Sequence, residues 1–279
     1  MTPQRVVWSE GMLVLPQHFQ QSDLYHERLL ASRLAALAPH TWGICALEMD
    51  LGALASEQVG ITRFQGVLPD GTALTFQAND AEAPASRPAG AHFAPAQPVL
   101  EVFLALPKER QGVPSVAAEN TDPAESRRAR YRAVSRSVGD LGGDSADLAM
   151  AFAQRNLSIL FGDEPGDDFD SIKIAEIARN PSGALCLNQA FIPALLCCSA
   201  SPFLMTNLRR LLALVTAKQR QLAQERQQRD AASVEFGANE VTRYLQLGAL
   251  NAAIPFLVHA GRAGELSARE LYLFLIQMV

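Results

Sequence analysis

The hydrophobic pattern of this 279-residue chain changes once, near Ser201-Pro202. Upstream, short runs rich in Val, Ile, Phe and Leu are separated by turn-forming segments such as Pro69-Asp70-Gly71, which is the pattern of β-strands. Downstream, apolar residues follow heptad spacing, at Leu204, Leu208, Leu211, Val215 and Leu222. The sequence therefore predicts a mixed fold in which a β domain is followed by a bundle of helices.

Seven apolar runs upstream of this change are predicted to be strands. They cover residues 42–51, 59–68, 73–77, 99–106, 130–138, 157–161 and 172–178. Because turns rather than helices join them, we expect antiparallel pairing in a β-sandwich or barrel-like domain. The connections at 81–98 and 107–125 are long for a compact domain, which is typical of functional or mobile loops.

Helices are predicted at both ends of the chain. The first covers residues 20–37, where four leucines have spacings compatible with one helical face: Leu24, Leu30, Leu34 and Leu37. The heptad segment forms a second helix, which ends at a break near Phe236-Gly237, and a third carries Val241 and the apolar residues that follow it. The last begins at Ser267, with Glu270 at the spacing of a capping box.

Charge and hydropathy exclude several classes of partner. The chain has 24 basic and 29 acidic residues, so it lacks the basic surface that neutralises nucleic-acid phosphates. Its first residues contain no apolar core followed by a cleavage site, so we expect no signal peptide and a cytoplasmic protein. The apolar stretches at 191–198 and 272–279 are shorter than the roughly 20 residues of a membrane-spanning helix, so we expect no membrane insertion.

The residue types that carry chemistry form no recognisable motif. The four cysteines, Cys45, Cys186, Cys197 and Cys198, lack the two-residue spacing of zinc and redox motifs and are expected to be buried thiols. His18 and His26 are eight residues apart, too far for a metal-binding pair on one helical face. We therefore predict no catalytic, cofactor-binding or metal-binding residues.

Two charged segments are predicted to be solvent-exposed. The acidic run at 162–170 lacks the pattern of a calcium-binding loop and is expected to be a loop between strands. In the basic cluster, arginines alternate with uncharged residues such as Tyr131 and Ala133, which favours a strand with one charged face. Binding of an acidic protein partner is the alternative. The members of the basic cluster are Arg127, Arg128, Arg130, Arg132 and Arg136.

Residues 6–23, VVWSEGMLVLPQHFQQSD, closely resemble the opening signature of the TssK family of type VI secretion baseplate proteins. In that signature a Trp-Ser-Glu-Gly-Met segment leads into Leu-Pro-Gln-His-Phe-Gln. The resemblance covers nearly the whole chain, because it continues at 66–72, 130–131, 172–177, 188–193, 250–255 and 270–272. The chain departs from the family at Ala194, where a second proline is common, and at Ser267-Ala268, where a His-Pro pair is common.

The resemblance implies a division into two parts. Residues 1–198 are expected to form a β-sandwich shoulder domain, with an N-terminal arm and a short helix, of the fold found in phage receptor-binding proteins. Residues 199–279 are expected to form a helical neck that trimerises. Since family members are longer, we expect this chain to lack their final head domain.

The function implied is that of a structural adaptor without enzymatic activity. A homotrimer would link the TssF and TssG wedge proteins, bound to the shoulder, to the inner-membrane complex at its cytoplasmic face. Contacts with the membrane-complex proteins TssL and TssM are expected mainly through the head. We nominate Trp8, Leu15, Phe19 and Leu24 for wedge or inter-subunit contacts. We nominate Leu208, Leu211, Val215 and Leu222 for the trimeric neck.

Two alternatives follow from the residues. A phage-tail-derived adaptor or receptor-binding protein outside secretion would share the fold and the trimer. A β-sandwich hydrolase would use His18, Asp23 or the acidic loop after Gly162. The hydrolase requires a deep pocket in which titratable groups with shifted pKa values converge.

Overall fold

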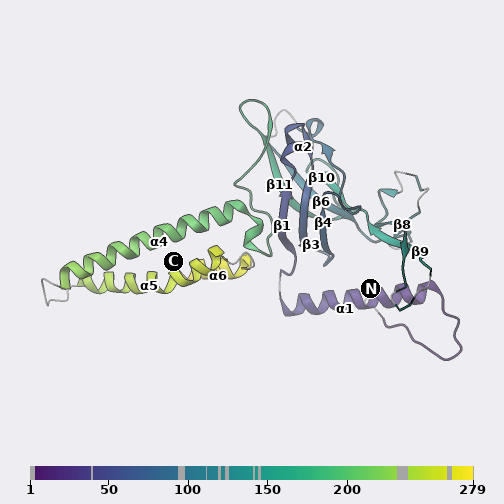
Figure 1. Ribbon diagram of the computed structural model, residues 1–279, viewed down its shortest axis with the longest axis horizontal. Coiled ribbons are helices and arrows are strands. Elements are labelled where there is room, and N and C mark those ends of the chain that lie inside the picture. The colour runs from purple at the N-terminus through teal and green to yellow at the C-terminus, as the bar shows by residue number, and fades with distance from the viewer. Residues whose placement is uncertain are drawn as a thin grey trace.

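A computed structural model describes residues 4–38, 40–93, 98–110, 112–118, 121–122, 126–140, 142–143, 146–230, 238–262 and 266–278. Figure 1 shows a β domain with a long helical hairpin projecting from one side of it and a separate N-terminal helix lying along it. This arrangement confirms the predicted mixed fold, with strands preceding the C-terminal helices. Among the described helices, none is long and apolar enough to cross a membrane.

Two antiparallel sheets form the sandwich of the β domain. One has the strand order β1-β3-β4, with β1 at Gly43–Met49, β3 at Ile61–Val67 and β4 at Ala73–Gln77. The other has the order β10-β6-β11-β12, with β10 at Ser158–Phe161, β6 at Val99–Pro107, β11 at Phe169–Arg179 and β12 at Leu185–Leu187. Alternate residues of both sheets enter one shared apolar core, which confirms the predicted β-sandwich.

The core is made of large side chains that are removed from solvent. Phe64 and Phe76 come from paired positions on β3 and β4, and their stacked ring centroids lie 5.6 Å apart. The second sheet covers them with buried residues that include Leu104, Ile159 and Ile174. The predicted turn at Pro69-Asp70-Gly71 joins β3 to β4: Gly71 has a φ of 91°, and the Asp70 carboxylate accepts from the Thr72 amide at 3.0 Å.

A ribbon of strands extends from the sandwich. It contains β7 at Val116–Ala117, β8 at Tyr131–Val138 and β9 at Leu148–Arg155. The expectation that all strands pair antiparallel was wrong here, because β7 runs parallel to β8. Strand β9 was not predicted, since the alanines of its Leu-Ala-Met-Ala-Phe-Ala sequence have low β-propensity.

Several short elements complete the β domain. A two-stranded sheet pairs β2 at Gln58–Val59 with β5 at Arg87–Pro88, and so part of the predicted long loop at 81–98 is a strand. A five-residue helix, α2 at Leu51–Ala55, follows β1. Single 3-10 turns occupy Gly90–His92 and Cys198–Ala200.

A long helix precedes the sandwich, and the described C-terminal residues form three further helices. Helix α1 covers Pro16–Leu37 and begins before the predicted residue 20, because Pro16 provides a preset first-turn conformation. Helices α4 at Pro202–Asp230, α5 at Ala238–Arg262 and α6 at Ala268–Gln277 form the C-terminal region. The predicted break near Phe236-Gly237 lies outside the described residues. The predicted capping box is confirmed: the Glu270 amide donates to the Ser267 hydroxyl at 3.1 Å, and the Ser267 hydroxyl donates to the Glu270 carboxylate at 2.9 Å.

The heptad seam of α4 is buried within its own chain. Leu208, Val215 and Leu222 are 4%, 7% and 6% exposed, and Leu211 packs at the edge of the same cluster. Helix α5 covers this seam, and Leu257, on α5, is fully buried. The requirement for a second helix is therefore met inside one chain, and the seam is not a free surface for another copy. Lys218 is exposed, so the polar interruption of the heptad lies toward solvent.

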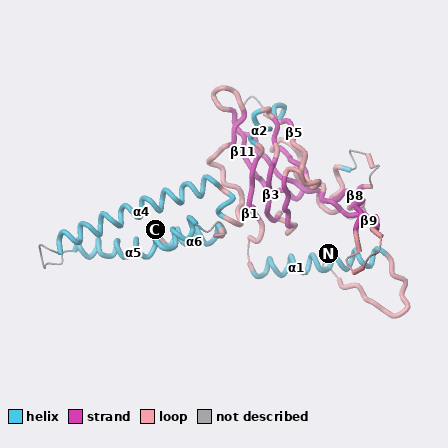
Figure 2. The backbone as a smooth tube through the Cα atoms, viewed as in Figure 1, coloured by secondary structure: helices cyan, strands magenta, loops and turns pink. Residues whose placement is uncertain are grey.

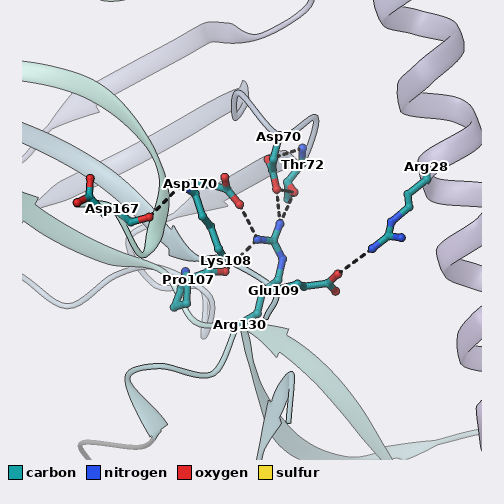
Figure 3. A network of polar contacts seen from close by, with 9 residues as sticks. All are labelled: Arg28, Asp70, Thr72, Pro107, Lys108, Glu109, Arg130, Asp167 and Asp170. Carbon is teal, nitrogen blue, oxygen red and sulfur yellow. Dashed lines mark hydrogen bonds and ion pairs between the residues drawn. The ribbon is translucent and has the colours of Figure 1, made fainter. Parts of the chain in front are cut away.

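Arg130 connects the ribbon to the sandwich through a buried ion network (Figure 3). It lies one residue before β8, and its guanidinium donates to the Pro107 carbonyl at 3.0 Å and to the Asp170 carboxylate at 3.1 Å. The same group donates to the Asp70 carboxylate and, at 2.6 Å, to the Thr72 hydroxyl. One cation thus holds the β3–β4 turn, the end of β6 and the start of β11 together.

The two carboxylates of this network are shifted in opposite directions. Burial opposes ionisation of Asp70, but hydrogen bonds from Thr72 and the positive charge of Arg130 outweigh it and lower the pKa of Asp70. Burial, followed by the negative charge of Asp70, raises the pKa of Asp170. Asp70 is therefore the principal counter-ion of Arg130.

Replacing Arg130 by Ala is expected to lower the free energy of unfolding by about 3 kcal/mol, because two partly buried carboxylates lose their cation. Urea unfolding followed by circular dichroism measures the change. The matched control is Arg128→Ala, two residues earlier and exposed, for which we expect a change within about 0.5 kcal/mol. Equal effects of the two substitutions would contradict the role given to the network.

Candidate partner-binding surface

The N-terminal arm and α1 expose more apolar surface than any other part of the sandwich region. No residue of the 22-residue helix α1 is buried, although Leu24, Tyr25 and Leu29 are half-buried. Figure 2 shows this helix beside the strands, preceded by the extended arm. The exposed large apolar residues are Val7, Trp8, Leu13, Val14, Leu15, Phe19, Leu30, Leu34 and Leu37. Many exposed apolar side chains within one segment are typical of a protein-binding site.

The arm folds back on the first turn of α1. The Trp8 ring lies 6.0 Å from the ring of His18 and 6.2 Å from that of Phe19, measured between centroids. His18 also places Nδ1 3.1 Å from the Leu15 amide, where it accepts a hydrogen bond at the start of the helix. Gly11 has a φ of 75°, which allows the reversal of the arm. Trp8 and Phe19, nominated from sequence, are thus brought together.

Few contacts hold α1 on the body of its own chain. Arg28 forms an ion pair with Glu109 at 3.7 Å, as seen in Figure 3, and both side chains are largely exposed. Ala31 lies over the β3–β4 turn, close enough that a Cβ on Gly71 would be 3.5 Å from the Ala31 methyl group. Exposed ion pairs contribute about 0–1 kcal/mol, so α1 is only lightly attached within one chain.

The nominated residues of α1 do not share one environment. Leu15 immediately precedes the helix and is exposed, as is Phe19. Leu24 is half-buried, whereas Leu30, Leu34 and Leu37 are exposed. The expectation that these four leucines form one face was therefore wrong for Leu24, because six residues at 100° each turn Leu30 well away from it.

The β8–β9 ribbon is a second exposed apolar surface, and sequence reasoning missed it. Leu148 is 65% exposed, and Met150 and Phe152 are also exposed. The period-two spacing of these three residues could have indicated a strand face, but the intervening alanines hid the signal. Of the predicted basic cluster, Arg132 and Arg136 lie on β8 and are exposed, whereas Arg130 is buried in the ion network.

The helical hairpin carries a third set of exposed apolar residues. On α5, Leu245 is 64% exposed, and Val241 and Tyr244 are exposed beside it, while Leu247 faces inward. Leu214 is the exposed apolar residue midway along α4. Helix α5 therefore has two apolar faces, of which α4 covers only one.

The candidate chemical groups are engaged in structural contacts. In the acidic loop, Glu164 forms a two-bond pair with Arg87 at 2.8 and 2.9 Å, and Asp163 lies 2.9 Å from His92. Burial opposes ionisation of Glu164, but the hydrogen bond from Arg87 outweighs it and lowers the pKa of this carboxylate. In the part of the chain that the structure describes, no three potential metal ligands come together.

The surface hollows also lack the features of a hydrolytic site. One hollow of about 390 Å³ lies between the ribbon and residues 80–82, and Asp80, Glu82 and Arg136 are among its lining residues. The described groups with shifted pKa values lie elsewhere, including Asp70, Asp170 and Glu164. His18 serves as a helix-end acceptor rather than facing a pocket with Asp23. The described residues thus provide no support for the hydrolase alternative.

The cysteines are free thiols in the described structure. Burial, followed by a hydrogen bond with Cys197, raises the pKa of the Cys45 thiol to about 11. Burial likewise raises the pKa of Cys198. Since the thiolate is the reactive form, these shifts make both thiols poor nucleophiles at neutral pH.

Comparison with known proteins identifies relatives along nearly the whole chain. Residues 18–279 match the family described as "Bacterial Type VI secretion, VC_A0110, EvfL, ImpJ, VasE". The chain is 30% identical over 276 residues to the type VI secretion system baseplate component TssK1 of Pseudomonas aeruginosa. That alignment covers 98% of this chain but only 60% of the relative.

Solved structures agree in fold. A crystal structure of TssK superposes with a TM-score of 0.87 at 26% identity, covering 99% of this chain and 60% of that one. A TssK-TssF-TssG baseplate subcomplex, determined by cryo-electron microscopy, contains a chain that superposes with a TM-score of 0.82 at 25% identity. That superposition covers 99% of this chain and 86% of the other.

Exposed apolar residues of the arm and of the first turn of α1 should contribute little to folding. We expect Phe19→Ala to change the free energy of unfolding by less than about 0.5 kcal/mol, because Phe19 is largely exposed. The matched comparison is Phe64→Ala in the sandwich core, which should cost about 3–5 kcal/mol. Urea unfolding of dilute protein measures both values. A cost for Phe19→Ala near that of Phe64→Ala would show that Phe19 supports the fold instead of a partner contact.

Proposed function

The chain belongs to the TssK family of type VI secretion baseplate components, and from this premise we propose that it is the trimeric adaptor region of such a baseplate. The match of residues 18–279 to the family carries the proposal. The large apolar surfaces left uncovered in a single chain support it, because an assembly protein must display what its partners bury.

We assign residues 1–198 to a shoulder and residues 199–279 to a neck. Two separate apolar clusters support this division: one fills the sandwich, and the other joins Cys198 to α4, α5 and α6. The last sandwich strand, β12, ends at Leu187, and α4 begins at Pro202. The boundary thus falls in the segment that links the two clusters.

Trimerisation is assigned to exposed apolar residues of the neck. Leu208, Leu211, Val215 and Leu222 would hold each hairpin together, and the hairpins would associate through exposed residues of α5. Val241, Tyr244 and Leu245 are the candidates for that contact. Burying such residues between copies is worth about 1.5–3 kcal/mol for each fully covered side chain, which favours association.

Wedge binding is assigned to the arm and the start of α1. A relative of this fold was determined as a TssK-TssF-TssG subcomplex, and we propose that this chain binds the corresponding TssF and TssG proteins. Trp8, Leu15 and Phe19 would be the anchors, since exposed aromatic residues often dominate binding energy. Leu24 is half-buried and would help to hold α1 on its own chain.

The complete adaptor would act without catalysis, in the cytoplasm at the inner-membrane face. Contacts with TssL and TssM would be made mainly by the head domain of full-length family members. Positioning of wedge proteins requires only binding surfaces, and the engaged polar groups described above fit that role.

Light scattering of the chain, alone and mixed with TssF–TssG, tests the proposal. We expect a mass near three times the 30.2 kDa of one chain, and a further increase on mixing. Leu245→Asp should reduce the mass toward that of one chain, while Gln246→Asp, an exposed neighbour, should not.

The wedge assignment is tested with Trp8→Ala/Phe19→Ala. This variant should remain a trimer and bind TssF–TssG at least about tenfold more weakly, because its aromatic anchors are missing. The control variant, Gln17→Ala/Gln20→Ala, changes two exposed residues at the start of α1. It should bind TssF–TssG as tightly as the unmodified chain does. A monomer that ignores TssF–TssG would contradict the adaptor function.

A further inference from the structure

One face of the β8–β9 ribbon combines apolar and basic side chains. Val134 pairs with Phe152, Arg136 with Met150 and Val138 with Leu148, and directly opposed residues share a face. Arg132 lies two residues before Val134 and so is on the same side. We call this the ribbon face: Phe152, Met150 and Leu148, with Arg132 and Arg136 beside them.

The ribbon face is largely uncovered in a single chain, although Arg136 and Phe152 line a hollow together with Asp80 and Glu82. Its three large apolar side chains are exposed, as are both arginines. Within the described part of the chain, neither arginine forms an ion pair, and Arg136 lies 5.8 Å from the Phe152 ring centre. An apolar strand face carrying two unpaired cations is suited to an apolar surface that carries carboxylates.

The outward side of α1 has the complementary composition. At 100° per residue, Leu30, Leu34 and Leu37 fall within one 60° sector, and all three are exposed. Two exposed carboxylates lie in or next to this sector, those of Asp23 and Glu27. Neither forms an ion pair among the residues that the structure describes. We call these five residues the outer face of α1.

The two faces also match in length. Leu30 and Leu37 are separated by about 10 Å along the helix axis at 1.5 Å per residue. Leu148 and Phe152 are separated by about 13 Å along the strand at 3.3 Å per residue. An apolar row on the helix can therefore lie along the apolar row of the ribbon.

A second copy of the chain is the occupant that fits both faces. The opposite side of α1 rests on its own sandwich, through Arg28 with Glu109 and Ala31 over Gly71. The outer face consequently points away from its own chain, and the ribbon face of the same chain remains uncovered. A contact between different surfaces of successive copies is heterologous, and it closes into a ring when the rotation permits.

We propose that the outer face of α1 in one copy packs against the ribbon face of the next, with Asp23 and Glu27 paired to Arg132 and Arg136. The proposal rests on the trimer proposed above and gives it a contact in the shoulder, in addition to that in the neck. It assigns Leu30, Leu34 and Leu37 to self-association, and leaves Trp8, Leu15 and Phe19 for the wedge.

Charge reversal and charge exchange test the contact. Asp23→Arg/Glu27→Arg and Arg132→Glu/Arg136→Glu should each raise the dissociation constant of self-association at least about tenfold, because like charges then face each other. Combining all four substitutions should restore it to within about threefold of the original value. Sedimentation equilibrium over a concentration series provides the constants, and circular dichroism verifies that each variant is folded.

The matched control is Arg127→Glu/Arg128→Glu, which makes the same change of charge at exposed residues outside the ribbon face. This variant should associate like the unmodified chain. Two results would overturn the α1–ribbon contact and leave the adaptor function intact. One is a trimer whose dissociation constant does not change with either charge reversal. The other is a charge reversal whose effect is not restored by combining all four substitutions. A chain that is monomeric before any substitution would overturn the proposed trimer together with this contact.

A cross-link between differently tagged copies gives an independent readout. Leu34→Cys in one copy and Met150→Cys in the other should be joined by a short bis-maleimide, since both positions lie in the proposed contact. Leu51→Cys replaces Leu34→Cys in the control, because Leu51 is exposed on α2 and outside both faces. Equal cross-linking from positions 34 and 51 would contradict the arrangement.

Discussion

The buried guanidinium of Arg130 is the interaction on which the peripheral parts of the shoulder depend. It joins the β3–β4 turn, the end of β6 and the start of β11, and β8 begins at the following residue. The ribbon has little core of its own, because nearly all side chains of β9 are exposed. Asn156 adds polar contacts at its base by donating to the Ser126 and Ala129 carbonyls. Polar contacts rather than apolar burial therefore fix the direction in which the ribbon points.

The same region supports α1, which lies over the β3–β4 turn and pairs with Glu109 just beyond β6. The Arg130 network thus orients the ribbon, whereas the Arg28–Glu109 pair and Ala31 place α1 on the same sandwich, and the outer surfaces of both stay uncovered. The helical hairpin combines burial and exposure in the same way. Helix α5 covers the apolar seam of α4 within the chain and keeps a second apolar face exposed. In each of the three regions the chain buries enough apolar surface to fold and exposes enough to assemble.

Local signals in the sequence were sufficient for much of this fold. The Pro-Asp-Gly turn, the Ser267 capping box and the runs that became β4 and β6 each depend on residues close together in the chain. The Arg130 network could not be predicted, because its partners Pro107, Asp170 and Asp70 are 23, 40 and 60 residues away. The heptad seam correctly required another helix, but spacing alone does not specify whether that helix belongs to the same chain. The ribbon face was missed because alanine occupies every second position of β9.

We propose that TssF–TssG binds the arm and the start of α1, whose apolar side chains are uncovered in a single chain. Hydrogen–deuterium exchange of the chain, alone and with TssF–TssG, tests this most directly, because it reports protection segment by segment. We expect exchange in residues 7–20 to slow at least about tenfold on binding, while the already protected strands β6 and β11 remain unchanged. Unchanged exchange in residues 7–20 of a complex that has demonstrably formed would contradict this assignment and place the wedge contact elsewhere on the shoulder.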